Sequence, residues 1–469
     1  MRLTGDRLRL SRDGPRLSPI RLLFYLVPIA GGLLVLWLLK IDRIQPLFTP
    51  PPTPTRTSLS YAEAGTAYFS AGDLGAAIQA YQAGVRAYPN DARLMAELAR
   101  VQTYSSALQT TAEKRRELLG EARQAVDRAV ELAPDDAFSQ AIRALVYDWS
   151  ASSEASIRGP KQREEFLTVA QTSATRALQL EPGNPLALAF AAEVLNDQQS
   201  FAQAIDLASQ AVSGADPQDP YSMDIHRVYG TVLESNGQYR LAIEEYSAAA
   251  AIAPNFTFLY LLIGANYRQL RDIDTALEYF DRAARINEQL SIEDPTPYLA
   301  IGRTYLQQGE FFIAARNIER ALAIDDENPD IYGRLGIVFF RARNYESAVV
   351  VLECAVDGCS QEVSRRVLCE FVYGCDPESA DAQQYGVDVT GLELGDDTLE
   401  YYYTYGSVLT YFRNTADRPT ACQDAERIFS LLLAAYGDDP VVTGIASESR
   451  ALCAAGPATA VPTATPPAE

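Results

Sequence analysis

Histidine is nearly absent from this sequence, and cysteine is missing from its first three quarters. His226 is the only histidine among 469 residues, which excludes HExxH metal sites and catalytic triads built on other histidines. The sequence also lacks a Walker A loop, a GxGxxG turn after a strand and a GxSxG elbow. It therefore predicts a protein that is not an enzyme and has no catalytic, cofactor or metal site. The side chain of His226 itself is expected to be packed or at the edge of a groove.

Basic residues are scarce beyond the N-terminal region. Residues 1–57 contain nine Lys or Arg and three Asp, which leaves 31 basic and 58 acidic residues in the remainder of the chain. Proteins that bind DNA or RNA need a basic surface, because phosphate contacts supply most of the affinity. The charge distribution therefore predicts that nucleic acid is not a partner.

One long run of the sequence has no charge. Residues 22–39 read LLFYLVPIAGGLLVLWLL, and at about 1.5 Å per residue a helix of this length approaches the thickness of a bilayer core. A cleaved signal peptide would have a shorter apolar region followed by small residues, whereas this run is followed by Lys40. The other alternative is a buried soluble helix. We interpret the run as a transmembrane signal-anchor.

The flanks of this run predict its orientation. Six arginines precede it, and only Lys40 and Arg43 follow it closely, so the positive-inside rule places the N-terminus in the cytoplasm. Residues 1–21 would then form a basic cytoplasmic tail and residues 40–57 a proline-rich linker. The expected localisation is a single-pass membrane protein with its main domain outside the cytoplasm.

All the cysteines lie beyond residue 350. They are Cys354, Cys359, Cys369, Cys375, Cys422 and Cys453. An even number, clustered in an exported domain, suggests three disulfides, for which fifteen connectivities are possible. We favour Cys422 with Cys453, because each lies on one of two successive helices that are expected to be neighbours. Free structural thiols are one alternative. Zinc binding is another, but the spacings fit structural zinc sites poorly.

A pattern of glycines and alanines repeats between residues 225 and 356. Gly230, Gly264, Gly302 and Gly336 are 34, 38 and 34 residues apart, and a large apolar or aromatic residue precedes each by four except at Gly230, where the residue is His226. A small, a large and a second small residue follow each glycine at fixed distances. These sets are Ala242/Tyr246/Ala249, Ala276/Phe280/Ala283, Ala314/Ile318/Ala321 and Ala348/Leu352/Ala355.

This pattern resembles the tetratricopeptide repeat, a helix-turn-helix unit of 34 residues. The resemblance implies an all-α fold, a right-handed superhelical solenoid, in addition to the single transmembrane helix. The expected repeats are 58–91, 92–134, 135–182, 183–222, 223–256, 257–294, 295–328 and 329–360. Residues 361–397 would form a cysteine-bearing insertion, residues 398–455 a degenerate repeat with a capping helix, and residues 456–469 a disordered tail.

The resemblance also predicts where a ligand would bind. In this family the first helices of the repeats line a concave groove, and the groove positions of the regular repeats carry five arginines: Arg227, Arg268, Arg303, Arg334 and Arg341. Because arginine binds carboxylates bidentately, we expect anion or carboxylate recognition along this strip. The alternative is that the arginines pair with neighbouring acids such as Glu234. The lysine and asparagine of the family's carboxylate clamp are absent here.

The expected function is therefore binding of a protein or peptide partner by a membrane-anchored scaffold. A permanently assembled structural subunit of a larger envelope complex is the alternative.

Overall fold

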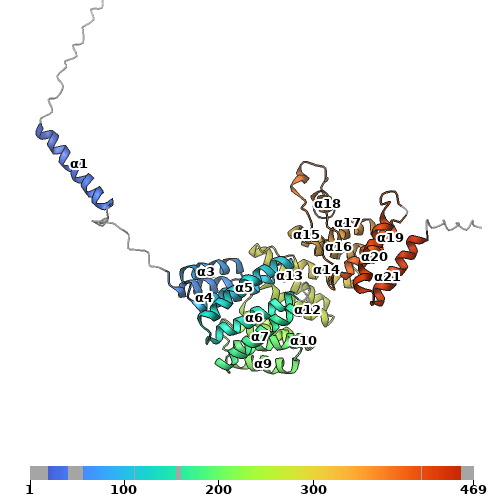
Figure 1. Ribbon diagram of the computed structural model, residues 1–469, viewed down its shortest axis with the longest axis horizontal. Helices are drawn as coiled ribbons and strands as arrows, with labels where there is room; N and C mark the ends of the chain where they lie inside the picture. The colour runs from blue at the N-terminus through green and yellow to red at the C-terminus, as the bar shows by residue number, and fades with distance from the viewer. Residues whose placement is uncertain (1–18, 41–55, 110, 155–159, 414, 456–469) are drawn as a thin grey trace, which may run out of the picture. The chain divides into compact units, whose positions relative to one another are not determined.

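The computed structural model describes residues 19–40, 56–109, 111–154, 160–413 and 415–455 (Figure 1). The chain forms two compact units, Met1–Thr57 and Ser58–Glu469. The predicted tail 456–469 lies outside the described residues, as do most of the predicted cytoplasmic tail 1–21 and most of the linker 40–57.

The first unit contains one described helix, α1, Pro19–Lys40. This helix includes the predicted span 22–39. Among the helices in the described part of the chain, however, none combines the length and the apolar character that crossing a bilayer requires. The prediction of a transmembrane helix therefore has no support in the structure.

The second unit begins with eight helix pairs, and in each pair two helices joined by a turn or loop pack against each other. The pairs are α2 (Ser58–Ser70) with α3 (Leu74–Ala87), α4 (Ala92–Ser106) with α5 (Ala112–Leu132), α6 (Ala137–Glu154) with α7 (Pro160–Leu180), α8 (Pro185–Asp197) with α9 (Phe201–Gly214), α10 (Ser222–Ser235) with α11 (Tyr239–Ile252), α12 (Thr257–Gln269) with α13 (Ile273–Leu290), α14 (Thr296–Gln308) with α15 (Phe311–Ile324), and α16 (Pro329–Arg341) with α17 (Tyr345–Val356). Helix α10 begins at Ser222, one residue before the range 223–256 that the sequence pattern suggests. The described residues form no strand, so the all-α prediction is confirmed for this part of the chain.

The repeated glycines let the two helices of a pair approach closely. A Cβ atom added to Gly264 would lie 2.5 Å from the ring of Phe280 and 3.0 Å from the carbonyl oxygen of Ala276. The alanines that precede the large residues, Ala276 among them, are completely buried. Large side chains therefore fill the space that small residues leave on the facing helix, which is the reason for the repeat pattern.

The second and third pairs are larger than the regular ones. Helices α5 and α7 have 21 residues each and α6 has 18, whereas α10, α11 and α12 have 13 or 14. The extra residues of these repeats therefore mainly lengthen helices.

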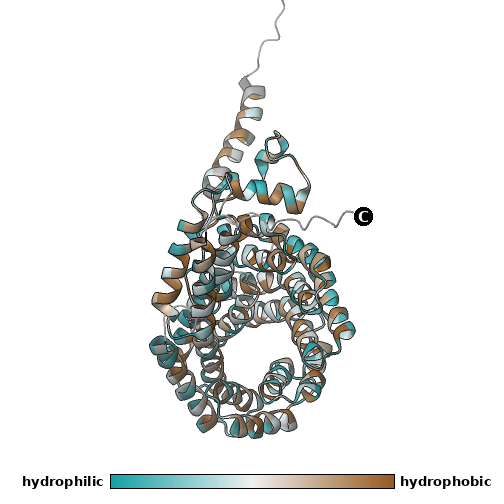
Figure 2. Ribbon diagram, turned by 90° about the vertical axis from the view of Figure 1, so that its right-hand side faces the viewer, coloured by the Kyte–Doolittle hydropathy of each residue, from teal (hydrophilic) through white to brown (hydrophobic). Residues whose placement is uncertain are grey.

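Successive pairs wind around an axis, and Figure 2 shows the helices of this unit following one another around a ring. The first pair and the fifth meet directly, since the Nδ2 atom of Asn255 donates a hydrogen bond of 2.8 Å to the carbonyl oxygen of Ala71. Gly72 has a φ of +80°, and a Cβ atom there would lie 2.7 Å from the Cβ atom of Asn255. The stretch from Ala71 to Asn255 thus makes about one turn of a superhelix, and the chain continues into a second.

The remaining elements follow the eighth pair. They are α18 (Gln361–Val367), a π-helix (Leu368–Tyr373), a 3₁₀ turn (Asp381–Gln384), α19 (Leu399–Tyr411), α20 (Ala421–Tyr436) and α21 (Pro440–Ala454). An isolated antiparallel bridge joins Cys359 to Val389. Side chains of α19, α20 and α21 share one hydrophobic core with those of α15, α16 and α17.

Three disulfides lie in this C-terminal part, and they use all six cysteines. The bonds are Cys354–Cys359, Cys369–Cys375 and Cys422–Cys453. The predicted pairing of Cys422 with Cys453 is confirmed, because it joins the neighbouring helices α20 and α21.

Candidate functional site

The first helices of several pairs line a cavity on the inner side of the superhelix, with a volume of about 660 Å³. Volumes of this size accommodate small molecules or a few side chains of a bound segment. One wall is apolar and includes Trp149 of α6 and Phe258, Leu261 and Leu262 of α12. None of these four side chains is fully buried, so part of the apolar wall is accessible.

Arg227 of α10 lies at this cavity, but all three nitrogen atoms of its guanidinium group already donate hydrogen bonds. Its Nη1 and Nη2 atoms each donate a hydrogen bond of 2.7 Å to the carboxylate of Glu193, and its Nε atom donates one of 3.1 Å to the hydroxyl of Tyr104. The indole of Trp149 also donates to Glu193, at 3.1 Å. Arg227 is therefore a buried structural residue, and ligand binding would require it to leave Glu193.

A second buried ion pair continues this network towards α4. Arg100 donates two hydrogen bonds to Asp224, of 2.5 and 3.1 Å, and the hydroxyl of Tyr104 donates a third to the same carboxylate, at 2.5 Å. All three side chains are buried. Because Arg100 and Asp224 are 124 residues apart, the network joins the second pair to the fifth.

Arg268 and Arg303 differ from Arg227. Arg268, at the end of α12, is half-buried at the cavity wall, and its nearest polar contact is a long hydrogen bond of 3.4 Å to the hydroxyl of Thr304. Arg303 on α14 is exposed. Neither forms an ion pair with a carboxylate among the described residues. Burial lowers the pKa of Arg268, and the positive charge of Arg303 lowers it further.

The other two predicted arginines have acidic partners. Arg334 donates to Asp330 on the same helix, at 2.6 Å, and Arg341 lies 3.5 Å from Glu400. The structure therefore divides the predicted strip, because three of its arginines are paired with carboxylates and two are not. The partners are not Glu234, which accepts a hydrogen bond from Tyr246.

Three residues of the cavity were not anticipated from the sequence. Arg115, at the start of α5, has a buried Nε atom for which the described residues provide no hydrogen-bond partner, and burial lowers the pKa of this side chain. Asp148 of α6 and Asp197 of α8 also line the cavity. These residues lie in the second, third and fourth repeats, which depart from the regular spacing of glycines and alanines. The groove positions of the family therefore do not identify them.

Asp148 is the most unusual of the three. Its side chain is 1% exposed, and its Oδ1 atom accepts no hydrogen bond from the described residues. Burial, and next the negative charges of Asp197 and Glu193, hold the pKa of Asp148 well above its usual range. Burial also raises the pKa of Asp197, whose carboxylate accepts a hydrogen bond of 2.8 Å from Ser152.

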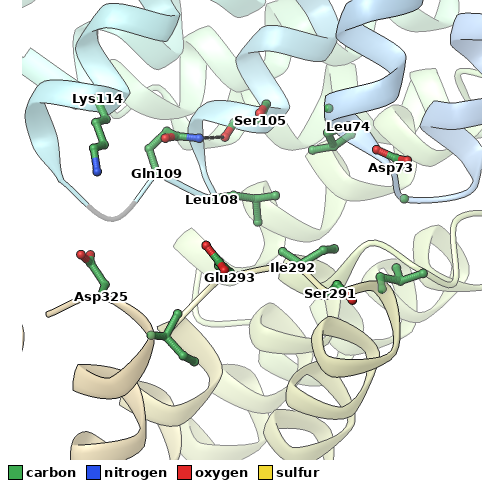
Figure 3. Close-up of a pocket in the computed structure, with 14 residues that line it drawn as sticks. Asp73, Leu74, Ser105, Leu108, Gln109, Lys114, Ser291, Ile292, Glu293 and Asp325 are labelled. Atoms are coloured by element: carbon green, nitrogen blue, oxygen red, sulfur yellow. Dashed lines mark hydrogen bonds between the residues drawn. The ribbon is translucent and has the colours of Figure 1, made fainter. Parts of the chain in front are cut away.

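A second cavity, of about 450 Å³, lies between successive turns of the superhelix (Figure 3). One side is formed by residues 72–75 together with Ser105, Leu108, Gln109 and Lys114, and the other by residues 290–293 and 324–325. Figure 3 shows Lys114 and Asp325 facing one another across the gap. This space results from the winding of the superhelix, and Leu74, Leu108 and Ile292 are among the apolar residues that line it.

His226 does not contribute to the inner cavity. Its Nδ1 atom lies 2.7 Å from the Oε2 atom of Glu245, on the second helix of the same pair, and both side chains are about one fifth exposed. The histidine is thus partly packed between two helices.

Helix pairs stacked around an inner cavity define an α-helical repeat solenoid, a class in which each unit packs on its neighbours. The particular repeat is identified by comparison with known families. A model of the tetratricopeptide repeat matches residues 62–103, 162–220, 230–291 and 299–361. The chain therefore contains tetratricopeptide repeats, as the sequence pattern predicted.

The solved structures that match parts of the chain come from several organisms. A thermophilic tetratricopeptide repeat protein of Thermus thermophilus is 16% identical, with a TM-score of 0.36, and the match covers 45% of this chain and 98% of that protein. The human IFIT1 dimer with PPP-AAAA is 13% identical, with a TM-score of 0.49, over 86% of this chain and 91% of that one. PilF of Pseudomonas aeruginosa is 17% identical, with a TM-score of 0.33, over 49% and 94%. No curated protein sequence matches the chain.

Proposed function

We propose that this protein is a non-catalytic scaffold that binds a peptide segment of a partner protein in its inner cavity. The observation that carries the proposal is the combination of an accessible apolar wall with two arginines, Arg268 and Arg303, that have no carboxylate partner among the described residues. The apolar wall would hold side chains of the segment, and the arginines would bind an anionic group, such as a carboxylate side chain.

The architecture suits this kind of recognition. The buried network around Arg227 and Asp224 fixes α4, α6, α8 and α10 relative to one another before any partner arrives. A preformed site limits the conformational entropy that is lost on binding, so more of the contact energy appears as affinity. The acidic balance of residues 58–469 supports a protein partner rather than a nucleic acid.

The test is peptide binding to the purified chain. Segments recovered from a pool of randomised 12-residue peptides would be measured individually against Arg268→Ala and Arg303→Ala. We expect each substitution to reduce the affinity for acidic peptides by about tenfold or more, since hydrogen bonds to charged groups contribute about 1.5–3 kcal/mol. Arg341→Ala is the matched control, because Arg341 belongs to the same predicted strip but pairs with Glu400.

The proposal fails if the Arg268 and Arg303 variants bind the peptides with the same affinity as the parent. It also fails if Arg341→Ala reduces the affinity as much as the other two substitutions do. A partner that co-purifies stoichiometrically from native membranes and occupies the cavity permanently would favour the structural-subunit alternative.

We further propose that the repeats are displayed outside the cytoplasm, attached to a membrane through residues 22–39. Three disulfides support export, because such bonds persist in oxidising compartments. The attachment itself rests on the uncharged run and its basic flank in the sequence.

A further inference from the structure

We propose that the side of the inner cavity formed by α6 and α8 is a subsite for a cation, the ammonium group of a lysine side chain on the bound peptide, and that Asp148 receives it. This inference rests on the proposed peptide-binding function and specifies the chemistry of the ligand. Arg268 and Arg303 would bind an anionic group, so the preferred segment carries charges of both signs.

The geometry of Asp148 carries this inference. A carboxyl group that is 1% exposed ordinarily has hydrogen-bond partners, because an unpaired buried polar atom costs free energy. Here the Oδ1 atom has none among the described residues, and Asp148 lines the cavity. The second carboxylate, Asp197, lines the same side. An ammonium group in this position would bring a positive charge between two acids, and it would donate to the buried Oδ1 atom once the carboxyl group turns towards the cavity.

The surroundings favour a cation over a neutral donor. The aromatic side chain of Trp149 lies next to Asp148 in the chain and also lines the cavity, and aromatic faces attract ammonium groups. The existing cations near Asp148 are engaged elsewhere. Arg227 pairs with Glu193, and Arg163 of α7 donates a hydrogen bond to the backbone carbonyl oxygen of Asp197.

Binding of a cation would change the protonation of Asp148. In the free protein burial, Asp197 and Glu193 raise its pKa, while Arg227 and Arg163 lower it by a smaller amount. The ammonium group would stabilise the carboxylate form, so binding would release a proton. The affinity for a lysine-bearing peptide should therefore increase as the pH rises, because less free energy is spent on removing that proton.

The experiment compares two pools of nine-residue peptides that are identical except at the central position, which is lysine in one pool and norleucine in the other. Calorimetric titration of the full chain in buffers of different ionisation enthalpy reports affinity and proton release together. We expect the lysine pool to bind more tightly and to release protons. In Asp148→Asn the preference for lysine should fall by about 30-fold, and proton release should disappear.

Asp127→Asn is the control, because Asp127 of α5 pairs with Arg143 at 2.7 Å and does not line the cavity. Asp197→Asn gives a second test if Asp148→Asn fails to fold. Asp197 is only half-buried, and its loss should weaken the lysine preference by about tenfold, as for one charge pair.

If the two pools bind the parent chain with equal affinity, and Arg268→Ala still reduces the affinity for both, the cation subsite is overturned and the proposed function stands. Failure of both pools to bind would overturn the two together. Cadaverine alone, binding as tightly as the lysine pool, would overturn the assignment to a peptide side chain.

Discussion

Two arginines that the sequence assigns to the same strip have different roles in the structure. Arg227 is buried and holds Glu193 in a bidentate pair, whereas Arg268 lies at the cavity wall without a carboxylate. The sequence predicted that both would face the inner side. It could not predict the pairing of Arg227, because Glu193 belongs to a different repeat, 34 residues away, which lacks the glycine of the regular pattern.

Asp148 should make the stability of the protein depend on pH. Its pKa is raised in the folded state, so the folded protein binds this proton more tightly than the unfolded chain does. The resulting stabilisation is complete below the ordinary pKa of 3.8 and is lost as the pH rises through the higher folded value. Asparagine does not titrate, so Asp148→Asn should not lose this stabilisation as the pH rises.

Urea unfolding of the parent chain and of Asp148→Asn at pH 5 and pH 8 measures this effect. As the pH rises from 5 to 8, the free energy of unfolding of the variant should increase relative to that of the parent. The relative increase should be at most about 1.4 kcal/mol per pH unit. A difference between the two proteins that is the same at both pH values would contradict the assignment.

At the level of elements, the regular repeats were the easiest part to predict. Gly264 and Phe280 occupy their repeat positions, and the structure packs them against each other. The long helices α5 and α7 were harder, since their added turns do not follow the 34-residue period. Arg115 belongs to one of these helices, which explains why that part of the cavity could not be located in the sequence.

Close packing at Gly264 makes a specific substitution costly. In Gly264→Ala the added methyl group would meet the ring of Phe280 and the backbone of Ala276, so we expect a loss of about 1–3 kcal/mol in the free energy of unfolding. Gly120→Ala is the control. Gly120 lies in α5 and would place its methyl group no closer than 3.6 Å to the side chain of Arg123, so this variant should gain about 0.5–1 kcal/mol. Chemical denaturation of both variants separates the steric clash at Gly264 from the gain in helix propensity. An equal change in the free energy of unfolding of the two variants would refute the packing argument.

Disulfides show the same division between what a sequence predicts and what it does not. Cys422–Cys453 could be predicted because two successive helices bring these residues together. The bonds Cys354–Cys359 and Cys369–Cys375 close short loops of irregular backbone, including a π-helix. Repeat spacing contains no information about such backbone, so these two pairings had to come from the structure.

For the whole molecule, the proposed display outside the cytoplasm leads to a labelling prediction. After mild reduction of intact cells, a membrane-impermeant thiol reagent should label the partly exposed Cys359, Cys375, Cys422 and Cys453 of the second unit, whereas Cys354 and Cys369 are buried. Without reduction the labelling should be low, because each cysteine is in a disulfide. Labelling that requires cell lysis would exclude this topology.

The contacts between distant repeats have a consequence for how this protein can vary. In an ordinary solenoid each unit contacts only its neighbours, so units can be gained or lost during evolution without disturbing the rest. Here Asn255 meets Ala71 across 184 residues, and Asp224 meets Arg100 across 124. Removal or duplication of a single unit between them would rotate these partners away from each other and expose buried charges. A change in the number of repeats in the first turn should therefore destabilise the fold, and we expect relatives that share this cavity to differ in loop and helix length rather than in repeat count.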